Sequence, residues 1–165
     1  RVRRANEAVA IFRSGRPAEA AALLADCLAL FPASTHDSKP FLTLQLNLGS
    51  AYAESGQLNR ARWTFEWVLA QATAQGDALR AAQAHFNLGN ALRQTNAEEA
   101  LFHYRKAVDY NPNLAAAYNN MGTLLGMQGR LKESEHNLRK ALEINPALEA
   151  ARINLDDVRK KLGKK

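Results

Sequence analysis

The sequence predicts an all-α fold built from repeated helical hairpins. Alanine and leucine, which favour helices, supply much of the 47% hydrophobic content, while only 7% of the chain is aromatic. A pattern of small, bulky and glycine positions also recurs every 33 to 41 residues, a period typical of helical repeat arrays. With 165 residues, the chain is long enough for one such array and too short for two ordinary domains.

Four blocks of the sequence align with one another. They begin at Asn6, Asn47, Asn87 and Asn120, so successive blocks start 41, 40 and 33 residues apart. The predicted repeats occupy residues 1–34, 42–81, 82–114 and 115–148. A further helix over about residues 149–163 has no partner, and its charged outer side is expected of a cap on a stacked array. We therefore expect one solenoid over residues 1–165, with about nine helices that pair antiparallel in sequence order.

Each block has the same internal order of residue types. A small residue lies midway along the first predicted helix, where the second helix must approach closely: Ala8, Gly49, Gly89 and Gly122. The turn between the two helices holds Gly15, Gly56 or Gly129, because a helix C-cap favours a residue that tolerates positive φ. In the third block Asn96 stands near this place, and it is expected to adopt the left-handed conformation instead.

Two spacers between the blocks are long. Residues 33–41 are predicted to form a loop, with Pro40 opening the next helix. Residues 70–81 contain no proline and are predicted to extend two helices around a turn at Gly76 and Asp77.

This combination of positions resembles the tetratricopeptide repeat, and the resemblance covers nearly the whole chain. The strongest match is the segment YNNMGTLLGMQGRLKESEHNLRKALEINP at residues 118–146. The resemblance implies a right-handed superhelical solenoid whose first helices line a concave wall, and it implies a protein or peptide partner. The longer spacing also resembles that of arrays in cell-polarity and G-protein adaptor proteins.

A row of asparagines is the main functional candidate. One stands at the same place in all four predicted repeats and in the last helix: Asn6, Asn47, Asn87, Asn120 and Asn154. Each lies two residues before the small packing position, or before Asp156 in the last helix, which is about 200° of helical rotation, so it faces away from its hairpin partner. By the family arrangement, the row then lies along the concave groove.

A carboxamide both donates and accepts hydrogen bonds, so a row of them can hold the backbone of an extended peptide. The row resembles the asparagine ladder of the O-linked N-acetylglucosamine transferase superhelix, where such residues hold a substrate polypeptide. The alternative is that asparagine is common at this place in the repeat and only faces water. The further groove residues that we predict are Leu46, Ser50, Phe86, Asn90, Arg93, Asn119 and Thr123.

A second candidate surface carries aromatic residues. Trp63 and Trp67 lie four residues apart on the second helix of the second repeat, hence on one face, and Phe102 takes the place of Trp63 in the third repeat. The family pattern makes this face convex. Aromatic residues are enriched at interfaces, so the face is a candidate for docking or self-association. The alternative is that the rings pack under the 70–81 connection.

No enzyme motif is visible in the sequence. The four histidines have no ligand spacing, and Cys27 is the only cysteine, so we expect no catalytic residue, metal or cofactor. The segment GTLLGMQGR lacks the Lys-Ser/Thr of a phosphate-binding loop. Two rival functions remain open: a substrate-capturing region of a larger enzyme of the glycosyltransferase or hydroxylase type, and a self-assembling scaffold.

Charge and hydropathy indicate which classes of partner to expect. The formal net charge of +6 comes mainly from residues 1–41 and 149–165 rather than from one face, so no nucleic-acid partner is expected. No apolar run reaches membrane-spanning length, and no signal peptide is visible. The chain begins with Arg1, so we expect a fragment or a processed product. The lone cysteine weakly favours a reducing compartment such as the cytoplasm, and the compartment stays open.

Overall fold

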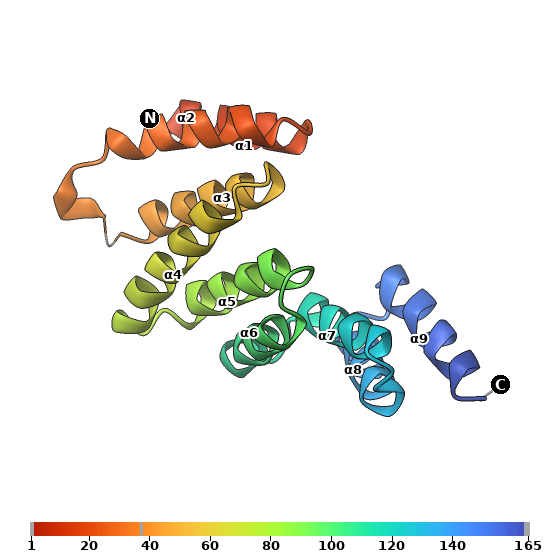
Figure 1. Ribbon diagram of the computed structural model, residues 1–165. Coiled ribbons are helices and arrows are strands. Elements are labelled where there is room, and N and C mark those ends of the chain that lie inside the picture. The colour runs from red at the N-terminus through yellow and green to blue at the C-terminus, as the bar shows by residue number, and fades with distance from the viewer. Residues whose placement is uncertain (1, 37, 164–165) are drawn as a thin grey trace. The chain divides into compact units, whose positions relative to one another are not determined.

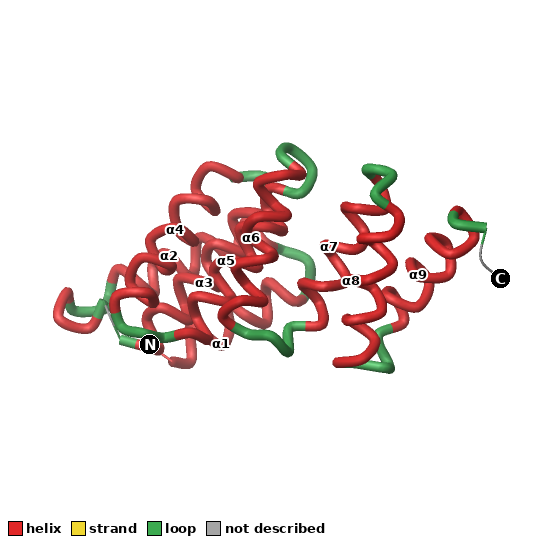
Figure 2. The backbone as a smooth tube through the Cα atoms, turned by 90° about the horizontal axis from the view of Figure 1, so that it is seen from below, coloured by secondary structure: helices red, strands yellow, loops and turns green. Residues whose placement is uncertain are grey.

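The computed structural model describes residues 2–36 and 38–163 of the chain (Figure 1). Within these ranges the backbone forms nine α-helices, one short 3-10 helix and no strand, which confirms the predicted all-α class (Figure 2). The helices are α1 (Val2–Arg13), α2 (Pro17–Ala29), η1 (Ala33–Thr35), α3 (Lys39–Glu54), α4 (Leu58–Ala74), α5 (Ala78–Leu92), α6 (Ala97–Tyr110), α7 (Ala115–Met127), α8 (Leu131–Ile144) and α9 (Glu149–Lys161).

The chain divides into two compact units, the first ending at Ala91 and the second beginning at Leu92. In the first unit, α1 packs against α2, α2 against α3, and α3 against α4. In the second unit, α6 packs against α7, α7 against α8, and α8 against α9. Short turns join the helices within each unit, so helices that are neighbours in sequence are neighbours in space, as a hairpin array requires.

Close contact between paired helices depends on the small residues of the repeat. In the first unit, a Cβ atom added at Gly49 of α3 would lie 2.5 Å from the Phe65 ring of α4, which is buried. In the second unit, a Cβ atom at Gly122 of α7 would lie 2.6 Å from Leu138 of α8. The buried Ser134 hydroxyl also donates a 2.6 Å hydrogen bond to the Gly122 carbonyl. These contacts agree with the sequence argument that the helices must approach closely here.

The turn glycines behave as predicted, and the asparagine in the third turn does not. Gly15, Gly56 and Gly129 all have positive φ, between 75° and 80°. By contrast, Asn96 has a φ of −148° and forms the N-cap of α6, where its Oδ1 accepts a hydrogen bond from the Glu99 amide. The left-handed prediction for Asn96 is therefore wrong. The turn between α5 and α6 ends in a side-chain cap, which requires an extended backbone at the capping residue.

The long connection between α4 and α5 is a helical extension around a tight turn, as predicted. Gly76 has a φ of 65°, and Asp77 then accepts hydrogen bonds from the Arg80 amide (3.2 Å) and guanidinium (2.7 Å). The same guanidinium donates to the Lys39 carbonyl and the Thr43 hydroxyl at the start of α3. Burial alone would raise the pKa of Asp77, but the hydrogen bonds from Arg80 outweigh it and lower that pKa below its ordinary value.

Candidate functional site

A hollow of about 570 Å³ in the second unit collects the predicted asparagines of that unit. We call it the amide groove. It is lined by Asn119, Asn120 and Thr123 of α7, Asn154 of α9, and Arg93 in the turn that follows α5. All five were predicted as groove residues, and all come from first helices of the repeat or from the turn after one. Its volume falls in the range of ligand-binding clefts, which is about 300–1,000 Å³.

The carboxamides of the amide groove are linked to one another. Asn154 Nδ2 donates to Asn119 Oδ1 (3.2 Å) and to Thr123 Oγ1 (3.0 Å). Asn119 Nδ2 donates in turn to Asn120 Oδ1 at 3.2 Å, and Asn120 Nδ2 donates to the Tyr104 hydroxyl at 3.4 Å. The side chains are therefore held in place by each other before any ligand binds.

The buried end of this network is the phenol of Tyr104 in α6. The side chain is completely buried, and burial raises the pKa of the phenol above its ordinary value. The hydrogen bond from Asn120 and the positive charge of Arg93 partly offset that rise. Tyr104 is not among the predicted groove residues. The sequence carried no signal that its hydroxyl would anchor the asparagine row.

The network decides which groups can bind a ligand. Both Nδ2 hydrogens of Asn154 are used internally, while its Oδ1 has no hydrogen-bond partner within the described residues. The Arg93 guanidinium likewise has no hydrogen bond or ion pair to the described residues, and Arg93 is exposed. The groove thus offers both an acceptor and a charged donor, which match the N–H and C=O groups of a peptide backbone.

Three further residues line the amide groove without having been predicted. They are Gln94, Leu124 and Met127. Met127 is 80% exposed, which is unusual for so large an apolar side chain. Its spacing of four residues from Thr123 could have revealed it, because residues four apart share a helix face. Met127 gives the groove a flexible apolar contact for a ligand side chain.

In the first unit, the predicted row is less enclosed. Asn87 of α5 donates to the Ser50 hydroxyl of α3 across a long 3.4 Å contact. Asn47 is half-buried and Asn6 is exposed, and neither side chain has a hydrogen-bond partner in the described part of the chain. Leu46, predicted to face the groove, is only 5% exposed and packs in the core cluster with Phe65, because α4 and α5 both cover it.

Two more predicted groove residues, Phe86 and Asn90, lie on the same helix as Asn87. Both are half-buried, and both make contacts inside the protein. Their placement on α5 beside Asn87 is compatible with a groove wall. Their role as ligand contacts therefore stays a prediction.

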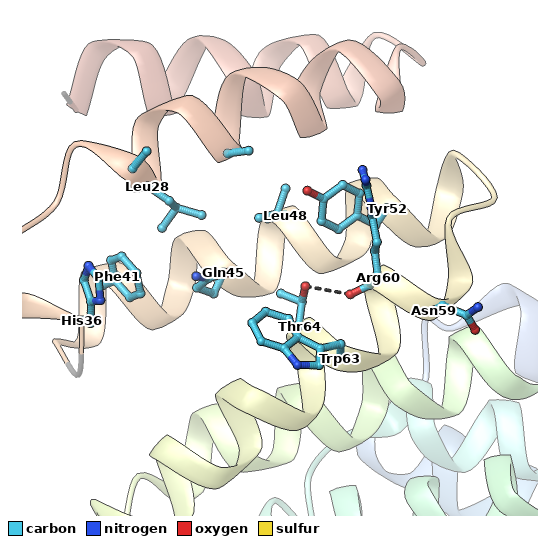
Figure 3. Close-up of a pocket in the computed structure, with 12 residues that line it drawn as sticks. Leu28, His36, Phe41, Gln45, Leu48, Tyr52, Asn59, Arg60, Trp63 and Thr64 are labelled. Atoms are coloured by element: carbon cyan, nitrogen blue, oxygen red, sulfur yellow. Dashed lines mark hydrogen bonds between the residues drawn. The ribbon is translucent and has the colours of Figure 1, made fainter. Parts of the chain in front are cut away.

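The aromatic surface forms a second hollow, of about 630 Å³, in the first unit (Figure 3). We call it the apolar groove. Figure 3 shows Leu28 on the α2 side, Leu48 and Tyr52 from α3, and Trp63 on the α4 side. Trp63 is 66% exposed. The groove can accept a large apolar side chain, since apolar and aromatic side chains make up most of its walls.

The three aromatic residues predicted for this surface differ in exposure. Trp67 is half-buried and meets the buried Phe41 edge to face, with ring centroids 5.9 Å apart. Phe41 is held on its other side by His36, which stacks on it at 4.4 Å. Phe102, in the second unit, is 51% exposed and has the Lys106 ammonium 6.0 Å from its ring centre. Of the three, Trp63 lines the apolar groove.

Over residues 2–36 and 38–163, no three His, Cys, Asp or Glu side chains gather as metal ligands would. In that part of the chain, no helix is both long and apolar enough to cross a membrane. Cys27 is buried in α2 as a free thiol, at the core position that its repeat place predicts.

Two family models match part of the chain. A family model described as "TPR repeat" matches residues 93–129, and one described as "Tetratricopeptide repeat" matches residues 114–145. No curated protein matches the sequence.

Several solved structures share the fold over nearly the whole chain. BtubC from P. vanneervenii is 21% identical with a TM-score of 0.76, and the match covers 94% of this chain and 70% of that one. A MamA structure is 18% identical with a TM-score of 0.71, over 98% and 82% of the two chains. A tetratricopeptide repeat protein from Parabacteroides merdae is 20% identical with a TM-score of 0.72, over 98% and 59%. The tetratricopeptide-repeat models thus match residues 93–145, and the chain as a whole shares the helical-hairpin fold of these solved structures.

Proposed function

We propose that the chain binds an extended peptide segment of a partner protein through the asparagine side chains of its first helices. Tetratricopeptide repeats serve generally as protein-interaction modules, and their fold is generally a non-catalytic scaffold. The finer proposal is that the amide groove holds the main chain of the peptide. Asn154 Oδ1 accepts from a peptide N–H, and Arg93 donates to a peptide carbonyl or to an acidic side chain.

The observation that carries this proposal is the convergence of five predicted residues on one hollow. Asn120 and Asn154 were predicted from their repeat position, and Arg93, Asn119 and Thr123 were predicted as their neighbours in the groove. Repeat arrays use extended surfaces of this kind to bind their partners. The exposed Met127 and Gln94 and the buried Leu124 add contacts for a ligand side chain, so the groove can both hold a backbone and prefer certain residues beside it.

The internal hydrogen bonds also favour binding. Asn119 and Asn120 are fixed by Asn154 and by the Tyr104 hydroxyl, so they lose little side-chain freedom when a peptide arrives. Ordering a flexible side chain at an interface costs about 0.5–1.5 kcal/mol, and a preorganised groove avoids part of that cost.

The test begins with a random peptide library displayed on phage and selected on the wild-type protein. The selected peptide is then titrated by fluorescence anisotropy against Arg93→Ala/Asn154→Ala. Losing two hydrogen bonds at about 1 kcal/mol each should weaken binding by at least tenfold. Asn113→Ala is the matched control, since Asn113 is an exposed asparagine in the turn before α7 and does not line the groove.

The proposed role of the amide groove is wrong if Arg93→Ala/Asn154→Ala stays folded by circular dichroism and binds the selected peptide as tightly as the wild type does. Titrating Trp63→Ala with the same peptide then shows whether the apolar groove of the first unit is the site instead. A loss of binding in Asn113→Ala as large as in the double variant would also count against the amide groove.

A further inference from the structure

The other side of α7 faces a groove of different chemistry. Two hollows of about 580 and 420 Å³ adjoin there and share Tyr118, Lys132 and His136. Together they run along α8 and reach α6, where Arg105 lines one wall. We call this the basic groove. It shares no lining residue with the amide groove, so the two can be occupied independently.

Basic residues line up along α8 in the basic groove. Lys132 and Arg139 lie on one helix face with His136 between them, since the three are spaced by four and then three residues. All three are exposed. The floor between them is apolar, because Met121 and Leu125 of α7 and Val108 of α6 line it.

The glutamates that line the same groove already have cationic partners. Glu133 is held by both Nε and Nη2 of Arg130, at 2.8 and 2.7 Å. Glu143 pairs with Lys140 at 3.2 Å, and Glu135 pairs with Arg159 of α9 at 3.5 Å. Their charges are therefore largely offset inside the protein.

Three cations of the basic groove, by contrast, have no such partners among the described residues. Arg105, Lys132 and Arg139 have no hydrogen bond or ion pair to any residue in the described part of the chain. Arg105 lies close enough to act electrostatically on Glu133, whose pKa is lowered mainly by its hydrogen bonds from Arg130. An anionic ligand would therefore gain charge pairs at three places without displacing an internal partner.

We propose that the basic groove is a second docking surface that takes a short acidic segment of a partner protein. Its Asp or Glu side chains pair with Arg105, Lys132 and Arg139, and an apolar side chain among them packs on Met121 and Leu125. Charge complementarity and the apolar floor together select this ligand. This surface is additional to the amide groove and does not depend on it.

A nucleic acid fits the groove less well than an acidic peptide does. Every nucleotide carries a phosphate, so a strand that follows α8 would also place phosphates beside Glu135 and Glu143, where Arg159 and Lys140 are already paired. A peptide can place its carboxylates only where the unpaired cations are. The apolar floor offers a contact for leucine-type side chains, whereas a base would have the rings of Tyr118 and His136 to stack on.

The probe is a short fluorescein-labelled peptide composed of Glu, Asp and Leu, with a second peptide in which Gln and Asn replace the acids. The full chain should bind the acidic peptide, with affinity that falls as salt rises, and should not bind the amide version. Lys132→Glu/Arg139→Glu should weaken binding by at least tenfold. Arg3→Glu/Arg4→Glu changes net charge equally on exposed residues of α1 and should stay within twofold of the wild type.

Two results would overturn the proposal. Equal loss in both charge-reversal variants would mean that the peptide senses only the overall charge of the protein. Tighter binding of a single-stranded oligonucleotide than of the acidic peptide, lost in Lys132→Glu/Arg139→Glu, would assign the groove to nucleic acid. Arg93→Ala/Asn154→Ala should bind the acidic peptide normally, so failure of the amide groove and failure of the basic groove are separate outcomes. Circular dichroism checks that each variant is folded.

Discussion

Gly122 in α7 is packed so closely against α8 that even a methyl group should not fit. A Cβ atom there would lie 2.6 Å from Leu138 Cγ, 2.9 Å from Leu138 Cδ2 and 3.2 Å from the Ser134 carbonyl oxygen. Leu138 is fully buried, so it has little room to move away. We expect Gly122→Ala to destabilise the second unit.

The magnitude follows from two opposing effects. Replacing glycine by alanine inside a helix gains about 1 kcal/mol of helix propensity. Forcing an extra carbon into a filled core costs about 1–3 kcal/mol. The 2.6 Å contact between the added Cβ atom and Leu138 Cγ puts the cost toward the upper end of that range. The net expectation is a loss of about 1–2 kcal/mol in the free energy of unfolding, which for a chain of this size lowers the melting temperature by roughly 2–8 °C.

Gly126 on the same helix is the matched control. A Cβ atom there would lie 3.1 Å from the Ser134 hydroxyl and 3.5 Å from Val158, which is much less severe. Gly126→Ala should therefore be close to neutral, since the propensity gain offsets a small adjustment. Urea unfolding followed by circular dichroism compares the two variants with the wild type. A Gly122→Ala protein as stable as Gly126→Ala would show that the packing of α7 on α8 is described incorrectly.

Three further predictions address the aromatic surface, acid stability and the asparagine row. Iodide should quench Trp63 readily in Trp67→Phe and should quench Trp67 weakly in Trp63→Phe; equal quenching would contradict their different burial. The pKa of Asp77 is lowered on folding, so its contribution is present above its unfolded pKa of about 3.9 and is lost as pH falls through the lower folded value. Asp77→Asn should therefore have a lower free energy of unfolding than the wild type at pH 7, and it should lose less of that free energy between pH 7 and pH 3. Urea unfolding at the two pH values measures this, and an equal loss in variant and wild type would contradict it. Asn120→Ala should lower the melting temperature more than Asn47→Ala does, because Asn120 donates to a buried tyrosine; the opposite order would mean that this bond adds nothing.

Local chemistry explains why so much of the fold could be predicted. A tight turn between helices needs a residue that tolerates positive φ, and Gly56 is an example. A close helix contact needs a small residue facing a large one, as Gly49 faces Phe65. Residue type and spacing indicate both features. Asn96 shows the limit of such reasoning. An asparagine can adopt a left-handed turn or cap a helix, and only the backbone path between α5 and α6 selects the cap.

The candidate site was predictable to a smaller extent. Repeat spacing placed Asn119, Asn120 and Asn154 on one side of their helices, and the structure gathers them in one hollow. The sequence could not predict which of their hydrogen-bonding groups remain available for a ligand. Asn154 uses both Nδ2 hydrogens internally and keeps only its Oδ1, and that depends on α7 lying beside α9.

By itself the sequence determined an all-α array of hairpins and its glycine turns, because each depends on contacts within a repeat. Only the tertiary structure decided that Trp67 packs against Phe41 while Trp63 stays exposed, and that paired glutamates leave three cations of the basic groove unpaired. Trp67 and Phe41 lie in different helices, as do Glu135 and Arg159. Contacts of this kind depend on how the helices pack, so spacing within one repeat cannot specify them.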